Sequence, residues 1–219
     1  IGMVATGSAR VHWPGAALEF ATVAGEVTSD LRFAPSLEAA RVRMTGSAGS
    51  WTLHGEQGLD GGTLASVDAA ITIDPADVTR SPLLGSLRVA SENLKPALEQ
   101  VARAFSGLPD ASAWLDDSPL VIDAALEGSL GAPRLAGTAA SERLRVRSLP
   151  ALNASAAFDV DATRLPVSKA AADDGAGNVF SGRAGIDFEA GTTTGSFSAG
   201  LKNPTPILTA LLREARNGV

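Results

Sequence analysis

The fold of this chain is decided by the stretch Leu120-Val-Ile-Asp-Ala-Ala-Leu-Glu-Gly-Ser-Leu-Gly-Ala-Pro-Arg-Leu-Ala-Gly137. Ile122, Ala124 and Leu126 alternate in it with the polar Asp123 and Glu127, and a turn containing Gly and Pro leads into a second alternating segment. A period of two places all the apolar residues of a strand on one face. The stretch therefore predicts two antiparallel strands, each with one apolar and one polar face.

The same alternation recurs along the whole chain, in the segments 8–13, 40–44, 67–74, 158–162, 184–189 and 196–202. Glycines open many of these units, and in the first part of the chain they recur roughly every 20 residues, which is the spacing of a meander or solenoid repeat. The chain is therefore predicted to be mainly β. Two arrangements of the apolar faces remain open: a closed β-sandwich that buries them, or one long curved sheet with a concave face that stays open. Composition alone favours the sandwich.

Two segments break the β pattern and predict short helices at about 92–106 and 206–217. In the first, Leu94, Leu98, Val101 and Phe105 form one helical stripe, with Ser91 as the expected cap. In the second, the apolar residues are Ile207, Leu208, Leu211 and Leu212.

Composition excludes several classes of function. The net charge of −6 argues against nucleic-acid binding, which needs clusters of Lys and Arg. The absence of cysteine removes disulfides, thiolate metal sites and cysteine nucleophiles. The chain opens on Ile1 inside a strand-like pattern, so we expect residues 1–219 to form a single elongated segment of a larger protein, with any anchor outside it.

No catalytic motif is visible. His12 and His54 occupy polar positions of alternating strands, and their neighbours in the sequence supply no catalytic or metal-binding partners. The loop from Asp173 to Asn178 lacks the terminal Glu of a calcium loop. We therefore expect no enzyme, no cofactor and no metal site.

The order of features from Ser91 to Val146 resembles the TamB family, the inner-membrane component of the translocation and assembly module, and its AsmA-like, bridge-like lipid-transfer relatives. In that family an amphipathic helix is often followed by strands of the type aliphatic-x-Gly-x-Leu-x-x-Pro-x-Leu-x-Gly. Here the motif runs from Leu126 through Gly128, Leu130, Pro133 and Leu135 to Gly137. About 50 residues carry the specific resemblance.

The resemblance implies a taco-shaped or half-pipe β-sheet in the periplasm of a diderm bacterium, in a parent protein anchored in the inner membrane. It implies an apolar groove for phospholipid acyl chains, a role in outer-membrane biogenesis, protein secretion and outer-membrane protein assembly, and an Omp85-type outer-membrane barrel as partner. No enzymatic activity goes with the family.

The candidate lining of the groove consists of large apolar residues on the expected inner face: Val11, Trp13, Val42, Ile71, Ile73, Ile122, Leu126, Val160, Ile186, Phe188 and Phe197. Each of them could equally be sealed core. Two alternatives keep the strands but change the function. One is a peptide-binding module that takes unfolded outer-membrane strands by β-augmentation, and the other is a closed β-sandwich with a purely structural role.

Overall fold

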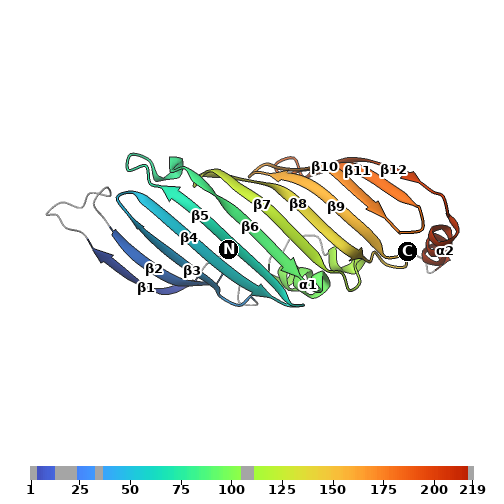
Figure 1. The fold of residues 1–219 in the computed structure, drawn as a ribbon, viewed down its shortest axis with the longest axis horizontal. Helices are drawn as coiled ribbons and strands as arrows, with labels where there is room; N and C mark the ends of the chain where they lie inside the picture. Colours follow the sequence, from blue (N-terminus) through green and yellow to red (C-terminus); the bar gives the residue numbers. More distant parts are fainter. Residues whose placement is uncertain (1–3, 13–23, 33–36, 105–110, 217–219) are drawn as a thin grey trace.

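The twelve strands of the described residues lie in one antiparallel sheet, in the order in which they occur in the chain. The computed structural model describes residues 4–12, 24–32, 37–104 and 111–216. The strands cross the long axis of the molecule obliquely, side by side from β1 to β12 (Figure 1). Within the described residues it is a single open sheet running from β1 to β12, so the predicted elongated curved sheet with two short helices is confirmed. The closed β-sandwich is wrong for the described residues, because no second sheet faces the first.

The elements have the following bounds. The strands are β1 Val4–His12, β2 Ala24–Arg32, β3 Ala40–Ser47, β4 Ser50–Leu59, β5 Thr63–Thr72, β6 Leu83–Ser91, β7 Leu120–Ser129, β8 Ala132–Leu144, β9 Leu152–Val160, β10 Arg164–Asp173, β11 Val179–Asp187 and β12 Thr192–Gly200. The helices are α1 Leu94–Ala104 and α2 Thr205–Arg216, with short 3-10 turns η2 Val78–Arg80 and η3 Ala111–Trp114.

Register joins the alternating patterns of single strands into one apolar face. Ile122 of β7 lies opposite Val89 of β6 on one side and Ala139 of β8 on the other. Ala139 in turn lies opposite Ala156 of β9. Directly opposed residues of an antiparallel pair share a face, so the apolar positions continue from strand to strand. The other face carries the polar positions.

Glycines inside strands permit close approaches between neighbouring strands of the sheet. A Cβ built on Gly137 would overlap the carbonyl oxygen of Asp123, and one built on Gly85 would overlap that of Asp68. Both glycines lie on the apolar face, opposite Ala124 and Ala69 respectively. Glycine in a strand interior marks such close approaches of neighbouring backbones. Gly85, one of the glycines predicted to open the units, thus lies inside a strand.

The curvature lets a single sheet bury part of its own apolar face. Ala69, Ile71 and Leu83 form the buried core cluster, and Ile71 is only 3% exposed. Five further side chains pack against this cluster, namely those of Met44, Trp51, Leu53, Ile73 and Leu126. This part of the groove is therefore filled by the chain itself.

Both helices lie close to their predicted positions. α1 begins at Leu94 rather than at residue 92, and its cap is Asn93, which accepts a hydrogen bond through Oδ1 from the backbone N–H of Lys95 (3.2 Å). The predicted cap, Ser91, is instead the last residue of β6, where its hydroxyl is 2.6 Å from that of Thr63. Phe105 of the predicted stripe lies outside the described residues. Among those residues, no helix combines the length and the apolar character that a membrane crossing requires.

Candidate functional site: an apolar groove

Most of the predicted lining residues share the apolar face. Register joins them through their opposed neighbours: Ile71 faces Trp51 and Leu83, and Leu126 faces Leu135, which faces Val160. On the same face lie Val42, Ile71, Ile122, Leu126, Val160, Ile186 and Phe197.

The other four predicted residues differ. Val11 pairs with Gly25 through its backbone, and its side chain is not among the described ones, while Trp13 lies outside the described residues. Ile73 follows β5 and packs against the core cluster. Phe188 follows β11, where its backbone N–H donates to the carbonyl of Thr163 (2.7 Å), and half of its surface is exposed.

The apolar face holds an open hollow of about 440 Å³ between β7 and β12. This volume lies within the range of about 300–1,000 Å³ that is typical of small-molecule sites. Eight alanines from four consecutive strands contribute to its lining. Six of them lie at positions of the apolar face: Ala139, Ala154, Ala156, Ala170, Ala172 and Ala184. Larger apolar side chains complete it, namely those of Leu120, Leu144, Phe180 and Phe197.

Two aromatic rings stand at the β11–β12 side of the hollow. The rings of Phe180 and Phe197 are stacked with their centroids 6.4 Å apart and an interplanar angle of 11°. Phe197 is nevertheless 76% exposed. A large apolar side chain this exposed beside an apolar hollow leaves surface that a ligand would cover.

The groove thus differs along its length. Between β3 and β7, large side chains close it, and the predicted Ile71, Ile73 and Leu126 belong to this packed part. Between β7 and β12, small side chains leave it open, and of the predicted residues only Phe197 lines the hollow.

The residues that make the hollow were missed because the prediction selected large apolar residues. Space on a sheet face arises where the side chains are smallest, as at Ala154, Ala156, Ala170 and Ala172. The signal was present, because these alanines recur at every second position of two neighbouring strands, apart from one extra residue in β10. A register shift between Val167 and Ala170 keeps the alanines of β10 on the apolar face.

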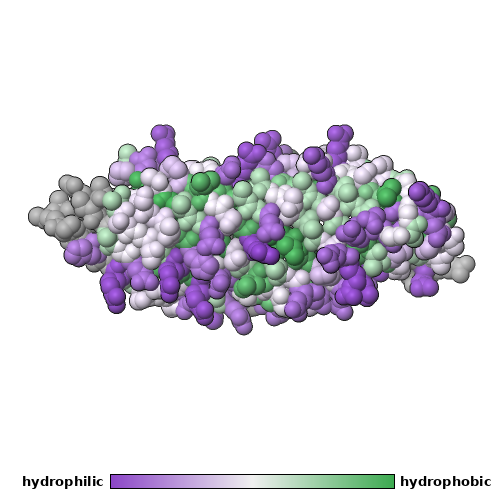
Figure 2. All heavy atoms as spheres, in the orientation of Figure 1, coloured by the Kyte–Doolittle hydropathy of each residue, from purple (hydrophilic) through white to green (hydrophobic). Residues whose placement is uncertain are grey.

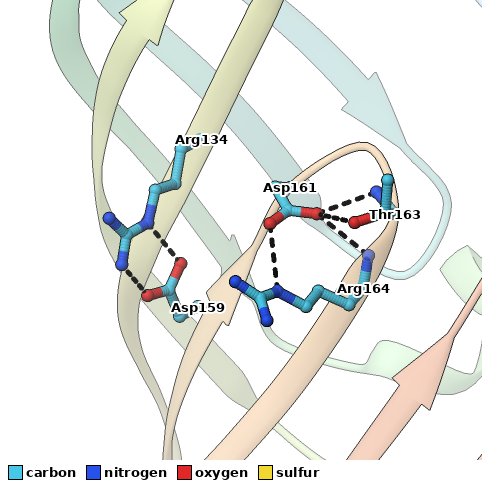
Figure 3. A network of polar contacts seen from close by, with 5 residues as sticks. All are labelled: Arg134, Asp159, Asp161, Thr163 and Arg164. Carbon is cyan, nitrogen blue, oxygen red and sulfur yellow. Dashed lines mark hydrogen bonds and ion pairs between the residues drawn. The ribbon is translucent and has the colours of Figure 1, made fainter.

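The polar face carries cross-strand ion pairs. In Figure 2, hydrophilic residues line both long edges and cross the face in view, with neutral and hydrophobic residues between them. Arg134 of β8 donates through Nε to Oδ1 of Asp159 on β9 (2.7 Å) and also through Nη2 to Oδ2 (Figure 3). These hydrogen bonds raise the pKa of Arg134 and lower that of Asp159.

Next to this pair, Asp161 closes the turn into β10. Its Oδ1 accepts hydrogen bonds from the hydroxyl and the N–H of Thr163 and from the N–H of Arg164, and its Oδ2 lies 3.3 Å from Nε of Arg164 (Figure 3). The hydrogen bonds from Thr163, followed by those from Arg164, lower the pKa of Asp161 to about 2. The carboxylate of Asp161 is therefore bonded to residues of its own turn, which gives it a structural role there.

His54 has partners that its neighbours in the sequence did not reveal. Its Nδ1 lies 2.7 Å from Oδ1 of Asp68 on β5, and its Nε2 lies 3.5 Å from Oε1 of Glu56. The hydrogen bond to Asp68 raises the pKa of His54. All three side chains are largely exposed on the polar face, away from the hollow.

Polar groups of the loop from Asp173 to Asn178 form hydrogen bonds with one another. Asp174 accepts from the N–H groups of Ala176 (2.9 Å) and Asn178 (3.1 Å) and from Nδ2 of Asn178 (2.6 Å). Burial raises the pKa of Asp174, but these hydrogen bonds outweigh it, so that the pKa is lowered overall. The carboxylate thus serves the turn, and no group of side chains suited to a metal is found among the described residues.

The comparisons with known proteins identify no family for this chain. A search of protein-family models, of curated proteins and of solved structures gave no match to this chain.

Proposed function

We propose that this chain binds lipid acyl chains in the hollow between β7 and β12, as a segment of a TamB-like protein of the bacterial envelope. The observation that supports the proposal is the open, almost wholly apolar hollow on a sheet with no second layer among the described residues. Burying a sixteen-carbon tail is worth on the order of 12 kcal/mol, at about 0.8 kcal/mol per methylene. A tail in the hollow would also remove the exposed apolar surface of Phe197 from water.

The proposed mechanism is passive binding, with no bond made or broken. An apolar track lowers the free energy of an acyl chain outside a bilayer while its head group stays in water. The periplasmic location, the inner-membrane anchor of the parent protein and the Omp85-type barrel partner rest on the resemblance of residues 91–146 to the TamB family, as does a role in outer-membrane protein assembly.

Native mass spectrometry of the purified chain tests the proposal. We expect bound phospholipid, and we expect Ala156→Phe to abolish it, because Ala156 lines the hollow. Ala157→Phe is the matched control, since its register partners Thr138 and Lys169 place it on the polar face. Both variants must keep the β-type circular dichroism of the parent. Equal phospholipid binding by the two folded variants would refute the site.

A second candidate is peptide capture at the edge strand β12. All nine residues of β12 are exposed, and within the described part of the chain it pairs only with β11. An unpaired edge can accept an extended peptide as an added strand. A nine-residue peptide of alternating apolar and polar residues, added to delipidated protein, should then slow hydrogen exchange in β12. Protection confined to the hollow would favour the acyl-chain function instead.

A further inference from the structure

One hydroxyl on the wall of the hollow has no hydrogen-bond partner. Ser141, near the end of β8, lines the hollow and is only 5% exposed. Its Oγ is buried and forms no hydrogen bond within the described residues. A buried hydroxyl that has lost water without gaining a partner lowers the stability of a fold. Such groups are rare in native structures, so the partner of this one needs to be identified.

Register places Ser141 on the apolar face, among small and aliphatic side chains. It lies opposite Ala154 of β9, which lies opposite Ala172 of β10. Leu120 and Leu144 also line the hollow. A bound water needs about two to four polar partners, and these neighbouring side chains offer none. The surroundings therefore favour a ligand that is apolar except for one hydrogen-bond acceptor.

The other serines that line the hollow belong to the polar face. The hydroxyl of Ser181 lies 2.8 Å from that of Ser198, and the hydroxyl of Ser196 accepts a hydrogen bond from Nε of Arg183 (3.1 Å). Ser155 is exposed and occupies a position of β9 between two alanines of the apolar face, so its side chain points to the polar face. Among the described lining residues, the apolar face thus carries a single hydroxyl.

The hollow differs at its two ends. From Ser141 the lining continues across Ala154 and Ala172 to Phe180 of β11. Strands lie about 4.8 Å apart, so these three spacings make a path of about 14 Å. The path ends at the stacked rings of Phe180 and Phe197. It therefore runs from a hydroxyl on β8 to aromatic rings on β11 and β12, with alanine methyl groups in between.

We propose that Ser141 donates a hydrogen bond to the carbonyl oxygen of an acyl ligand, whose tail extends across the alanines to the rings of Phe180 and Phe197. The inference rests on the proposed acyl-chain function and adds a ligand class and a direction to it. Rotation about χ1 moves Oγ between three staggered positions, so the hydroxyl can turn toward a carbonyl in the hollow. The carbonyl belongs either to the ester of a phospholipid or to a free fatty acid.

A matched pair of ligands tests this hydrogen bond with the whole chain. Lauroyl lysophosphatidylcholine and its dodecyl ether analogue differ only in the carbonyl group, which is a methylene in the ether. We expect Ser141→Ala to weaken binding of the ester about three- to tenfold, the contribution of one hydrogen bond, and to leave binding of the ether unchanged. Ser155→Ala removes a hydroxyl on the polar face and is the control, which should bind both ligands like the parent. Isothermal titration calorimetry below the critical micelle concentrations measures these affinities.

Two further measurements use the same variant. Dodecanoate distinguishes the two sources of the carbonyl, because a loss of affinity for the lysophospholipid assigns a phospholipid ester, whereas a loss for dodecanoate alone assigns a free fatty acid. Without ligand, Ser141→Ala should keep or raise the melting temperature, because it removes a buried hydroxyl that has no partner.

Several results would overturn the inference, and they differ in what they leave standing. If Ser141→Ala weakens neither the ester nor dodecanoate, or weakens ester and ether equally, the hydroxyl is not the partner, although the acyl-chain function stands. A clearly lower melting temperature of the ligand-free variant would show that the hydroxyl already has a partner within the protein. If none of the ligands binds the parent chain, the acyl-chain function fails together with the inference.

Discussion

At the scale of single residues, the register of β4 and β5 brings His54 and Asp68 into a hydrogen bond that changes the pKa of the histidine. The two residues are 14 positions apart, and their atoms Nδ1 and Oδ1 lie 2.7 Å apart. The hydrogen bond stabilises the protonated imidazole, so the pKa of His54 is raised in the folded chain.

We predict that NMR titration gives His54 a pKa above about 6.5, the value of an unperturbed histidine. A raised folded pKa adds stability that is fully present below about pH 6.5 and is lost as the pH rises through the folded pKa. Asp68→Asn should return the pKa of His54 toward its ordinary value and remove that pH dependence of unfolding. Asp159→Asn, which removes the ion pair with Arg134 between β8 and β9, is the control and should leave His54 unchanged.

At the scale of elements, the close approach of neighbouring strand backbones depends on glycine. We predict that Gly137→Ala lowers the free energy of unfolding by about 1–3 kcal/mol, because the added methyl group overlaps the backbone of Asp123 on β7. Gly58→Ala in β4 is the control, since its Cβ would meet only the carboxylate of Glu38 at 3.6 Å. Urea unfolding of both variants measures the difference. Equal effects at the two positions would show that the close approach of β7 and β8 does not require glycine.

The attachment of α2 is a second property at this scale. Asn178 is fully buried, and its amide donates to Asp174 (2.6 Å) and to the carbonyl of Asn203 (2.7 Å). We predict that Asn178→Ala loosens α2, because it leaves these buried polar groups without partners. Hydrogen exchange of the α2 amides should then become faster. Asn153→Ala, which removes only one exposed contact of 3.4 Å, should not change it.

At the scale of the whole molecule, the proposed ligand should stabilise one part of the sheet and not the other. A ligand that binds only the folded chain raises its stability, by about 2.7 kcal/mol at a hundred times its dissociation constant. We predict that a lysophospholipid raises the melting temperature and slows hydrogen exchange in β8–β11, around the hollow. Exchange in β3–β6 should stay unchanged, because their apolar face is already packed. Protection spread evenly over all strands would contradict this division.

The sequence predicted the faces of the strands but not the space between their side chains. Alternation at Ile122, Ala124 and Leu126 is the same in an open and in a closed sheet, so it could not decide between half-pipe and sandwich. The hollow depends on which small side chains register brings together from β8 to β11, and no single segment shows that pairing. The partner of His54 could have been found, because a turn centred on Gly61 brings positions 54 and 68 opposite each other.

The order of the strands has a consequence for how the chain folds. Among the described residues every strand pairs only with its neighbours in the chain, so the contacts between strands join segments that directly follow one another. The longest excursion lies between β6 and β7, where the chain leaves the sheet to form α1 and η3. Low contact order favours rapid folding, and nearest-neighbour coupling lets structure nucleate in any hairpin and spread along the array. The sheet is therefore expected to assemble one hairpin at a time, and to unfold from its edges while its packed middle still holds.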